Sequence, residues 1–285
     1  MSRNRLVPGA EIVAVPGRGL AVRTPEGEFL TVRTGGADQQ SLLSRLAGED
    51  TGPRADEELD RVVRGFEQAG YLAEETRPAP WPADRRRVLL LGDRTLTGPL
   101  AAHLADLGAD PRTDPRPSAS PTSPVSVDDL LAADPAAVVW CLGTPAPDGL
   151  WDAADRLPEH GVAWLRCHRE GWQAYVEPLA AGPGDVTSGH VRARRLAATP
   201  AHRELAAYWS GPRTLGTPVR LTVAAASLLA ALLADDLWRW ATGVRETTGL
   251  PARRRLRRVD LRTLTVTEHP VLPVPDVAPM PEARA

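Results

Sequence analysis

Three short, nearly continuous apolar runs constrain the fold of this chain more than any other feature. They cover residues 88–92, 136–142 and 162–167. Runs of this length without alternation are typical of parallel strands buried on both faces. A helix is expected directly after the first run, over residues 98–107, and a strand, a turn and a helix in that order start an α/β fold of the nucleotide-binding type. We therefore predict an α/β domain over residues 85–285.

The first 76 residues carry a different pattern, in which strand-like segments come first and helices follow. Residues 11–15 form a short apolar run, and residues 20–24 and 29–34 are also β-prone. Pro25, Glu26 and Gly27 separate the last two runs and suit a tight turn. Leu30 and Val32 alternate with polar neighbours, which is typical of a half-buried strand. We predict three strands, of which the last two form a hairpin.

Two amphipathic helices are expected after Gly36. Asp38 is a suitable N-cap for the first, whose apolar face we assign to Leu42, Leu43 and Leu46. The second helix begins near Ala55, carries acidic residues in its first turn and ends at Gly70. Its apolar residues recur at intervals of three and four, as on one helix face; they are Leu59, Val62, Val63 and Phe66.

Proline separates this small unit, residues 1–76, from the rest of the chain. Residues 78–82 are Pro-Ala-Pro-Trp-Pro, which is typical of a stiff linker, and we assign residues 77–84 to it. Residues 111–124 are rich in Pro, Ser and Thr and are expected to form a loop without an element of its own. The remaining expectations are helices over 194–209 and 222–242, strand-like segments over 256–267, and an extended tail over 269–285.

Composition excludes several classes of partner and chemistry. A formal net charge of -2 provides no field to hold a polyanion, so nucleic acid is not expected as a partner. The chain contains no lysine, which closes Schiff-base and P-loop mechanisms. Cys141 and Cys167 are too few for a disulfide framework and favour a reducing cytosol, with core packing as the better account of both. Residues 1–15 lack a signal-peptide run, and the apolar stretch 221–237 is too short for a membrane span.

Residues 92–98, Gly-Asp-Arg-Thr-Leu-Thr-Gly, lie where a nucleotide-binding fingerprint is expected, after a buried strand and before a helix. The middle glycine is absent, so Arg94 and Thr95 place side chains where backbone would approach a pyrophosphate. We interpret the segment as a tight turn in a fold that has lost its nucleotide. Thr95 and Thr97 remain candidates for contact with an anion.

Two arginine-rich runs and eight tryptophans are the other conspicuous side chains. The runs lie at residues 192–195 and 253–258. We favour solvated faces for both, with the carboxylates of a protein partner as the alternative. Most of the tryptophans are expected in the core, whereas Trp238 and Trp240, near a helix end, are candidate anchors for a dimer or a partner surface.

Residues 11–75, with strands before helices, resemble the PqqD-like winged-helix recognition element that binds leader peptides of ribosomally made natural products. The rest resembles the ThiF-like, ubiquitin-activating-enzyme-like partner proteins of azole-forming cyclodehydratases, including those of thiopeptide biosynthesis. The most specific stretch is residues 265–276, Thr-Val-Thr-Glu-His-Pro-Val-Leu-Pro-Val-Pro-Asp, which is similar to the closing segment of actinobacterial members. The resemblance implies a winged-helix domain followed by a degenerate Rossmann-like, ThiF-like α/β domain.

The chain departs from this family at its metal site. Family members carry a Cys-x-x-Cys pair after the closing Pro-Asp, where this chain has Val277 and Met280. They carry another pair before an arginine, and the aligned positions here are Thr187 and His190. Valine and methionine cannot replace thiolate ligands of Zn²⁺. The resemblance therefore implies a lost zinc site and no cofactor on this chain, and the eroded glycine loop weakens the case for adenylation.

The resemblance implies a binding function without catalysis. An extended leader peptide would add as a strand beside residues 28–34, with its apolar side chains in the groove that faces the second helix. A separate YcaO-type cyclodehydratase would supply ATP and form the thiazoles or oxazoles, and a homodimer is a further expectation. The rival interpretations are a diverged ThiF-like adenylyltransferase and a winged-helix DNA-binding regulator. The candidate peptide-binding residues are Glu28, Phe29, Leu30, Thr31, Val32, Arg33, Leu59, Arg61, Val62, Val63 and Phe66, and no catalytic or metal-binding residue is assigned.

Overall fold

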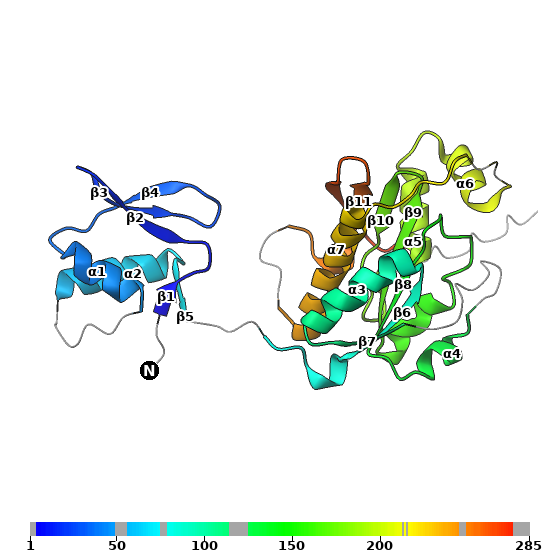
Figure 1. The fold of residues 1–285 in the computed structure, drawn as a ribbon, viewed down its shortest axis with the longest axis horizontal. Helices are drawn as coiled ribbons and strands as arrows, with labels where there is room; N and C mark the ends of the chain where they lie inside the picture. The colour runs from blue at the N-terminus through cyan, green and yellow to red at the C-terminus, as the bar shows by residue number, and fades with distance from the viewer. Residues whose placement is uncertain are drawn as a thin grey trace, which may run out of the picture. The chain divides into compact units, whose positions relative to one another are not determined.

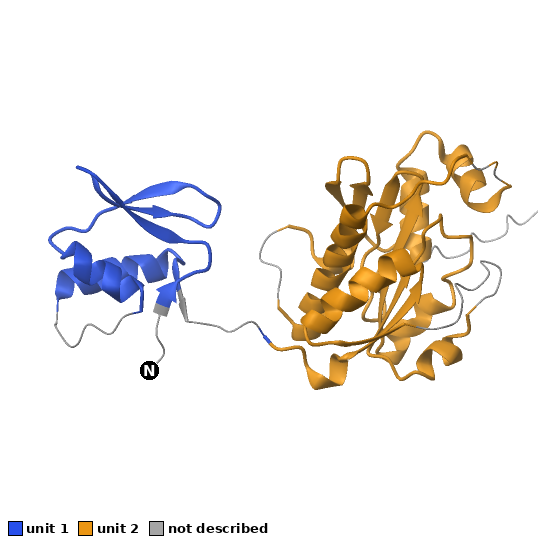
Figure 2. Ribbon diagram, in the orientation of Figure 1, with its two compact units in different colours: residues 1–79 blue, residues 80–285 orange. Residues whose placement is uncertain are grey.

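The computed structural model describes residues 4–48, 56–74, 79–113, 125–212, 214, 216–244 and 249–275. The chain divides into two compact units, residues 1–79 (unit 1) and residues 80–285 (unit 2), which are described separately (Figure 2). The predicted α/β class, with strands before helices in the first unit, is confirmed (Figure 1). In the described ranges, no helix has the length and apolar character needed to cross a membrane.

Unit 1 packs a three-stranded antiparallel sheet against two helices (Figure 1). The sheet order follows the chain, with β2 (Glu11–Val15), β3 (Gly19–Arg23) and β4 (Phe29–Val32). The helices are α1 (Gln39–Leu46) and α2 (Glu57–Gln68). Alternate residues of β3 and one face of each helix meet in a core because the strand period of two and the helix period of 3.6 each align apolar side chains. This core includes Leu20, Val22, Leu42, Leu46, Leu59 and Phe66.

Local details of unit 1 support some sequence predictions and correct others. Asp38 caps α1 as predicted, accepting a hydrogen bond of 2.8 Å from the backbone N–H of Ser41. Leu43 is 37% exposed and does not belong to the buried face of α1, because on the helical wheel it lies outside the sector that Leu42 and Leu46 share. A second sheet, β1 (Asn4–Leu6) with β5 (Leu72–Glu74), was not predicted. Three residues per strand are too few to establish a period.

Unit 2 is built on a seven-stranded mixed sheet in the order β7-β6-β8-β9-β10-β11-β12. The strands from β7 to β9 are parallel and the last three are antiparallel to their neighbours. The chain passes from β6 outward to β7 and then back to β8 on the other side of β6, which makes the gap between β6 and β8 the topological switch point. The strands are β6 (Arg87–Gly92), β7 (Asp110–Thr113), β8 (Ala137–Cys141), β9 (Ala163–Glu170), β10 (Gln173–Val176), β11 (Arg255–Asp260) and β12 (Thr265–Pro270).

Both faces of this sheet are covered, which explains the continuous apolar runs. Along β6, Val88 and Leu90 join a core with α3 (Arg94–Asp106) and α7 (Val223–Thr242), while Leu89 and Leu91 join a second core on the other face. The second core includes side chains of α4 (Val127–Leu131) and of the 3-10 helix η2 (Ala154–His160). Two further helices follow β10, α5 (Ser188–Ala197) and α6 (His202–Ser210), and short 3-10 helices lie at Ala83–Arg85 and Ala252–Arg254.

The element boundaries of unit 2 differ from the prediction at three places. α3 begins at Arg94 rather than at Gly98, because Asp93 caps it and leaves no glycine loop. β7 occupies the start of the predicted loop 111–124, pairing in parallel with β6, while residues 114–124 lie outside the described residues. The single helix expected over 194–209 is two helices, α5 and α6, separated at Thr199–Pro200, since proline disfavours helical backbone in the residue before it.

Three more side chains of unit 2 lie in surroundings that the pattern did not indicate. Trp81, expected in the linker, is buried in the α3–α7 core and donates a hydrogen bond to the carbonyl of Arg85. Arg255 and Arg257 are buried rather than solvated, and both bind the carboxylate of Asp236 on α7. The solvated-face interpretation of the run 253–258 is therefore wrong for these two residues, because alternate side chains of β11 point to the core. Trp238 and Trp240 are half-buried against the same core.

Candidate functional site

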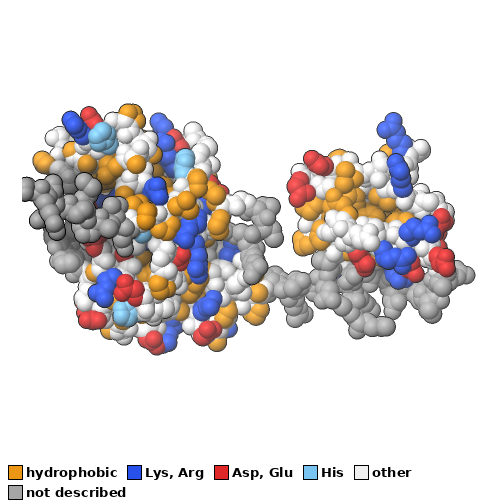
Figure 3. All heavy atoms as spheres, turned by 180° about the vertical axis from the view of Figure 1, so that it is seen from behind, with side chains coloured by type: hydrophobic (Ala, Val, Ile, Leu, Met, Phe, Trp, Pro, Cys, Tyr) orange, Lys and Arg blue, Asp and Glu red, His pale blue; other side chains and the backbone are white. Residues whose placement is uncertain are grey.

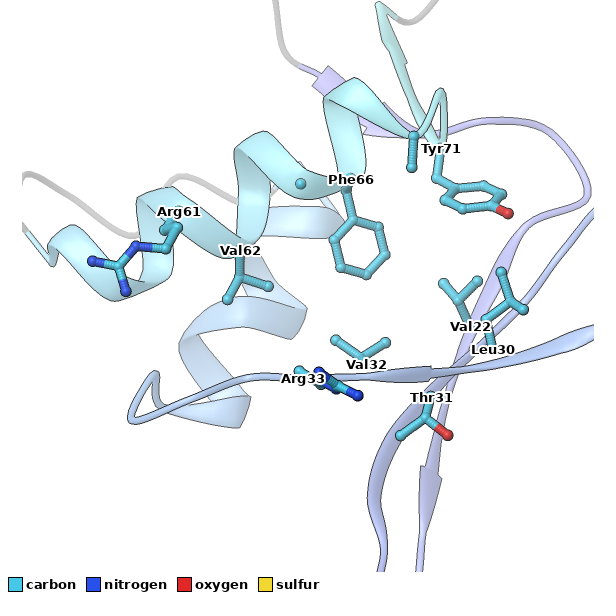
Figure 4. Close-up of a pocket in the computed structure, with 11 residues that line it drawn as sticks. Val22, Leu30, Thr31, Val32, Arg33, Arg61, Val62, Phe66 and Tyr71 are labelled. Atoms are coloured by element: carbon cyan, nitrogen blue, oxygen red, sulfur yellow. The ribbon is translucent and has the colours of Figure 1, made fainter.

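Unit 1 has a groove between the edge strand β4 and the helix α2 (Figure 4). Its volume is about 350 Å³, and its lining is mainly apolar. Hydrophobic side chains gather at the surface of unit 1 in the space-filling view (Figure 3), and Leu30 on β4 is 43% exposed. Exposed apolar concavities are more often interaction sites than other parts of a protein surface are. The groove is lined by Val22, Leu30, Thr31, Val32, Arg33, Arg61, Val62, Gly65, Phe66, Ala69 and Tyr71.

Strand β4 presents an open backbone edge to the groove. Among the described residues it pairs only with β3, through the register Val22 with Leu30 and Leu20 with Val32. The turn shows which residue pairs of this ladder are hydrogen-bonded, because the N–H of Thr24 donates to the carbonyl of Glu28 at 2.8 Å. Hydrogen-bonded and non-bonded pairs alternate along an antiparallel ladder. The N–H and C=O groups of Phe29 and Thr31 therefore point away from β3, toward the position of an added strand.

Helix α2 forms the facing wall, and its start is firmly capped. The Asp56 carboxylate accepts hydrogen bonds from the N–H groups of Glu58 and Leu59 at 3.0 and 3.1 Å. Phe66 is 6% exposed and contacts Tyr71 edge-to-face, with ring centroids 6.5 Å apart. Because Phe66 is fixed by the core below it, the floor of the groove is rigid on the side of α2.

The structure brings seven of the eleven predicted peptide-binding residues together in this groove: Leu30, Thr31, Val32, Arg33, Arg61, Val62 and Phe66. The other four do not line it. Leu59 is buried and Val63 is half-buried, and both pack in the core of unit 1, whereas Phe29 is 63% exposed and Glu28 closes the hairpin. Sequence reasoning missed Val22, Gly65, Ala69 and Tyr71. Gly65 and Ala69 follow Arg61 at intervals of four, so helical spacing alone could have found them.

In unit 2 two segments of the chain pack closely together at the switch point between β6 and β8. Gly92 has a φ of 99°, and a Cβ there would clash with the carbonyl oxygen of Cys141 on β8. A Cβ at Gly143 would clash with the carboxylate of Asp93. That carboxylate accepts hydrogen bonds from the N–H and the hydroxyl of Thr95, at 2.9 and 2.8 Å. Thr97 is 2% exposed, so its hydroxyl is not presented to an anion as the sequence suggested, and the hydroxyl of the exposed Thr95 is bonded to Asp93.

A second polar constellation of unit 2 lies beneath α5 and α6. Arg195 donates two hydrogen bonds to Glu170, at 2.9 and 2.6 Å, and Trp209 donates a third at 2.8 Å. Burial raises the pKa of Glu170, but hydrogen bonds from His168 and Arg195 outweigh it and hold this pKa well below its usual value. Burial raises the pKa of Glu177, which faces the other side of His168. The adjoining cavity of about 10 Å³ has room for no more than about one water molecule, so these groups hold one another.

Thr187 and His190, which the sequence resemblance aligns with a cysteine pair, form a helix cap. Thr187 is the N-cap of α5, and its hydroxyl accepts a hydrogen bond of 3.2 Å from the N–H of His190. The Nδ1 of His190 accepts one of 3.2 Å from the N–H of Thr187. Val277 and Met280 lie outside the described residues. Within the described ranges, no group of three or more His, Cys, Asp or Glu side chains is arranged to hold a metal ion.

The chain is similar in fold to several solved structures. A heterocyclase in complex with substrate and cofactor has a TM-score of 0.59 and 16% identity, covering 96% of this chain and 39% of that one. The heterocyclase TruD has a TM-score of 0.58 and 16% identity, covering 96% and 42%. Escherichia coli MccB with ATP has a TM-score of 0.56 and 11% identity, covering 96% and 98%.

These likenesses show a shared fold, that of the heterocyclase TruD and of MccB. The chain spans about two fifths of the length of the two heterocyclase chains that it matches. No protein-family model and no curated protein sequence matches it.

Proposed function

We propose that this chain binds the leader of a ribosomally made precursor peptide and presents that precursor to a separate YcaO-type cyclodehydratase for thiazole or oxazole formation. The observation that carries the proposal is the groove of unit 1, where an open strand edge and an apolar helix wall face each other. The resemblance of residues 11–75 to PqqD-like recognition elements and the fold shared with heterocyclases support it.

Strand addition accounts for affinity in this proposal, and the groove accounts for selectivity. An extended peptide beside β4 satisfies the outward N–H and C=O groups of Phe29 and Thr31. Every second side chain of the peptide then points into the groove, toward Leu30 and Phe66. Binding of the leader by one module raises the effective concentration of the remaining precursor near the partner enzyme.

Unit 2 has the function of a scaffold in this proposal, and catalysis belongs to the partner. Asp93 places a carboxylate at the start of α3, the end of a helix that would otherwise favour a phosphate. The chain has no lysine to clamp phosphates, and the backbone of Gly92 packs so closely against the carbonyl of Cys141 that a side chain there would clash. We therefore place ATP on the partner enzyme.

The test is a titration of the full chain with a fluorescently labelled leader encoded beside its gene. We expect a dissociation constant in the micromolar range or tighter, or roughly 8 kcal/mol of binding free energy. Thr31→Pro removes one outward N–H of β4 while the bonds of Leu30 and Val32 to β3 remain, so we expect it to weaken binding by about tenfold or more. Ala14→Pro is the matched control, because it removes an outward N–H from β2 at the opposite edge.

Equal binding by wild type, Thr31→Pro and Ala14→Pro would contradict strand addition at β4. The presentation step has its own readout, which is mass spectrometry of the precursor incubated with the YcaO-type enzyme. Azole formation is expected to require this chain and to fall with Thr31→Pro in proportion to binding. Azole formation at the same rate without the chain would contradict the presenting function.

A further inference from the structure

The groove of unit 1 is chemically asymmetric along its length. The basic residues Arg61 and Arg33 lie toward one end, and Leu30, Val22 and Tyr71 lie toward the other (Figure 4). The carboxylates in the first turn of α2 do not line the groove. Arg33 and Arg61 come from opposite walls, so both add positive charge at the same end of the groove, where a carboxylate of a bound peptide would be favoured.

Gly65 leaves the helix wall of the groove bare at a position where the fold does not need glycine. Its backbone is ordinary helix without a positive φ, and a Cβ built there would meet no atom within 4 Å. Glycine inside a helix is less stable than alanine because it loses more backbone freedom on folding. Gly65 therefore lowers the stability of the helix without avoiding a clash. We attribute its presence to the space that it leaves in the groove.

The spacing along α2 matches the repeat of an extended peptide. Arg61, Gly65 and Ala69 are successive i, i+4 positions on one face of the helix. Four helical residues advance about 6 Å, and two residues of a strand advance about 6.6 Å. Residues i and i+2 of an added strand point to the same face. A peptide whose residue i meets Arg61 therefore brings residue i+2 opposite Gly65.

We propose that the groove selects a peptide segment with an acidic residue and, two positions later, a bulky apolar residue. The carboxylate lies at the basic end and pairs with Arg61, and the apolar side chain fills the space over Gly65 between Leu30 and Phe66. The order of the two residues follows from addition antiparallel to β4, which is the more stable pairing and runs from the basic end to the apolar end. This proposal rests on the proposed function and specifies what the groove accepts.

Selection from short random peptides displayed on phage tests the motif and does not require the identity of the precursor. The full chain is the target, and clones retained equally by Thr31→Pro are discarded. Among the clones that depend on β4, we expect enrichment of Asp or Glu followed two residues later by Leu, Ile, Phe or Met. Enrichment of the reverse order, of another spacing, or of apolar residues without an acid would overturn the proposal.

A charge exchange tests the basic end with one selected peptide. Arg61→Glu should weaken binding of the acidic peptide by about tenfold or more, and exchanging the peptide acid for arginine should restore it. Arg64→Glu is the matched control, since Arg64 lies on α2 outside the groove and its replacement makes the same change in net charge. Equal effects of the two variants would show that only the overall charge matters and would overturn the contact with Arg61.

Gly65→Ala tests the bare position through two effects of opposite sign. The variant should unfold at a higher temperature, because alanine favours helix, yet bind the selected peptide about fivefold or more weakly, because its methyl group occupies the groove. Gly189→Ala in α5 is the matched control, where only ordinary contact awaits the methyl group and binding should not change. Unchanged binding by Gly65→Ala would overturn the use of this space.

Strand addition and the motif can fail separately. If selection yields no clone that depends on β4, the proposed strand addition fails together with the motif. If clones depend on β4 but lack the motif, or ignore Arg61 and Gly65, the groove still binds peptides and only the proposed specificity is wrong.

Discussion

The groove of unit 1 and the switch point of unit 2 are two places where such folds could hold a ligand, and they are built in opposite ways. In unit 1 a bare glycine on α2 leaves space open, whereas in unit 2 two glycines let the chain close on itself. Arginines line one end of the groove, whereas the carboxylate of Asp93 lies at the switch point. The difference teaches that glycine by itself does not indicate a ligand site. In one unit glycine leaves space on the surface of a helix, and in the other it lets two segments of the chain pack together.

Of the variants that test this comparison, Asp236→Ala is expected to have the largest effect, which is on the stability of unit 2. The change leaves the guanidinium groups of Arg255 and Arg257 buried without their buried carboxylate partner, while their ion pairs with the partly exposed Glu268 remain. Breaking a buried ion pair costs about 3–5 kcal/mol of unfolding free energy. Guanidinium-induced unfolding provides the measurement. Asp235→Ala is the matched control, because its pair with Arg239 is exposed and contributes less than about 0.5 kcal/mol.

The same variant tests whether binding resides in unit 1. At a temperature where Asp236→Ala remains folded, its affinity for the leader should equal that of the wild type. A loss of affinity together with the loss of stability would contradict this assignment, because unit 2 would then contribute to binding.

An intermediate effect is expected from Glu170→Gln, which removes the charge that Arg195 and Trp209 bind. We expect a loss of about 2 kcal/mol at neutral pH. The folded pKa of Glu170 is depressed, so its stabilising contribution is present above the ordinary value of 4.5 and is lost as pH falls toward the folded pKa. The gap between wild type and variant should therefore be widest at neutral pH and narrow below about pH 4.5.

Urea unfolding of both proteins over a pH series measures this gap, with Glu159→Gln as the control at an exposed ion pair. A gap that stays constant under acid conditions would show that the charge of Glu170 does not stabilise unit 2.

The smallest effect is expected from Asp93→Ala, and it tests the closed site directly. Loss of this N-cap should cost about 1 kcal/mol, as should Asp38→Ala, which removes the corresponding cap of α1 in unit 1. We expect no binding of ATP by either variant in equilibrium dialysis. ATP binding gained by Asp93→Ala alone would show that a single carboxylate keeps the switch point closed, and it would revive the adenylyltransferase interpretation.

Periodicity made much of the fold predictable. The alternation around Leu30 and Val32 indicated β4, and the three- and four-residue spacing from Leu59 to Phe66 indicated α2. Among the described elements only α1 lies between these segments along the chain, and the resemblance to a peptide-recognition element paired them, so the groove between them could be predicted from the sequence. The continuous apolar runs likewise indicated strands covered on both faces, as β6 and β8 are.

The rest depended on contacts between distant residues, which a local pattern does not contain. Arg255 and Arg257 appear polar in any local window and are core residues because the carboxylates of Asp236 on α7 and of Glu268 on β12 pair with them. Arg166 is fully buried for a similar reason, bound to Asp155 and Glu177. The closure of Gly92 on Cys141 depends on the strand order, which places β8 beside β6. The role of Gly65 was not predicted because an apolar pattern registers side chains and not their absence.

The open edge of β4 also bears on the solubility of the free protein. An unpaired edge strand is a template for another copy of itself as much as for a peptide, and sheets that expose such edges tend to associate. β4 is only four residues long, and Arg33 follows it directly. Short strands and charged side chains discourage edge-to-edge pairing. The arginine that attracts an acidic peptide therefore also protects the empty site from self-association.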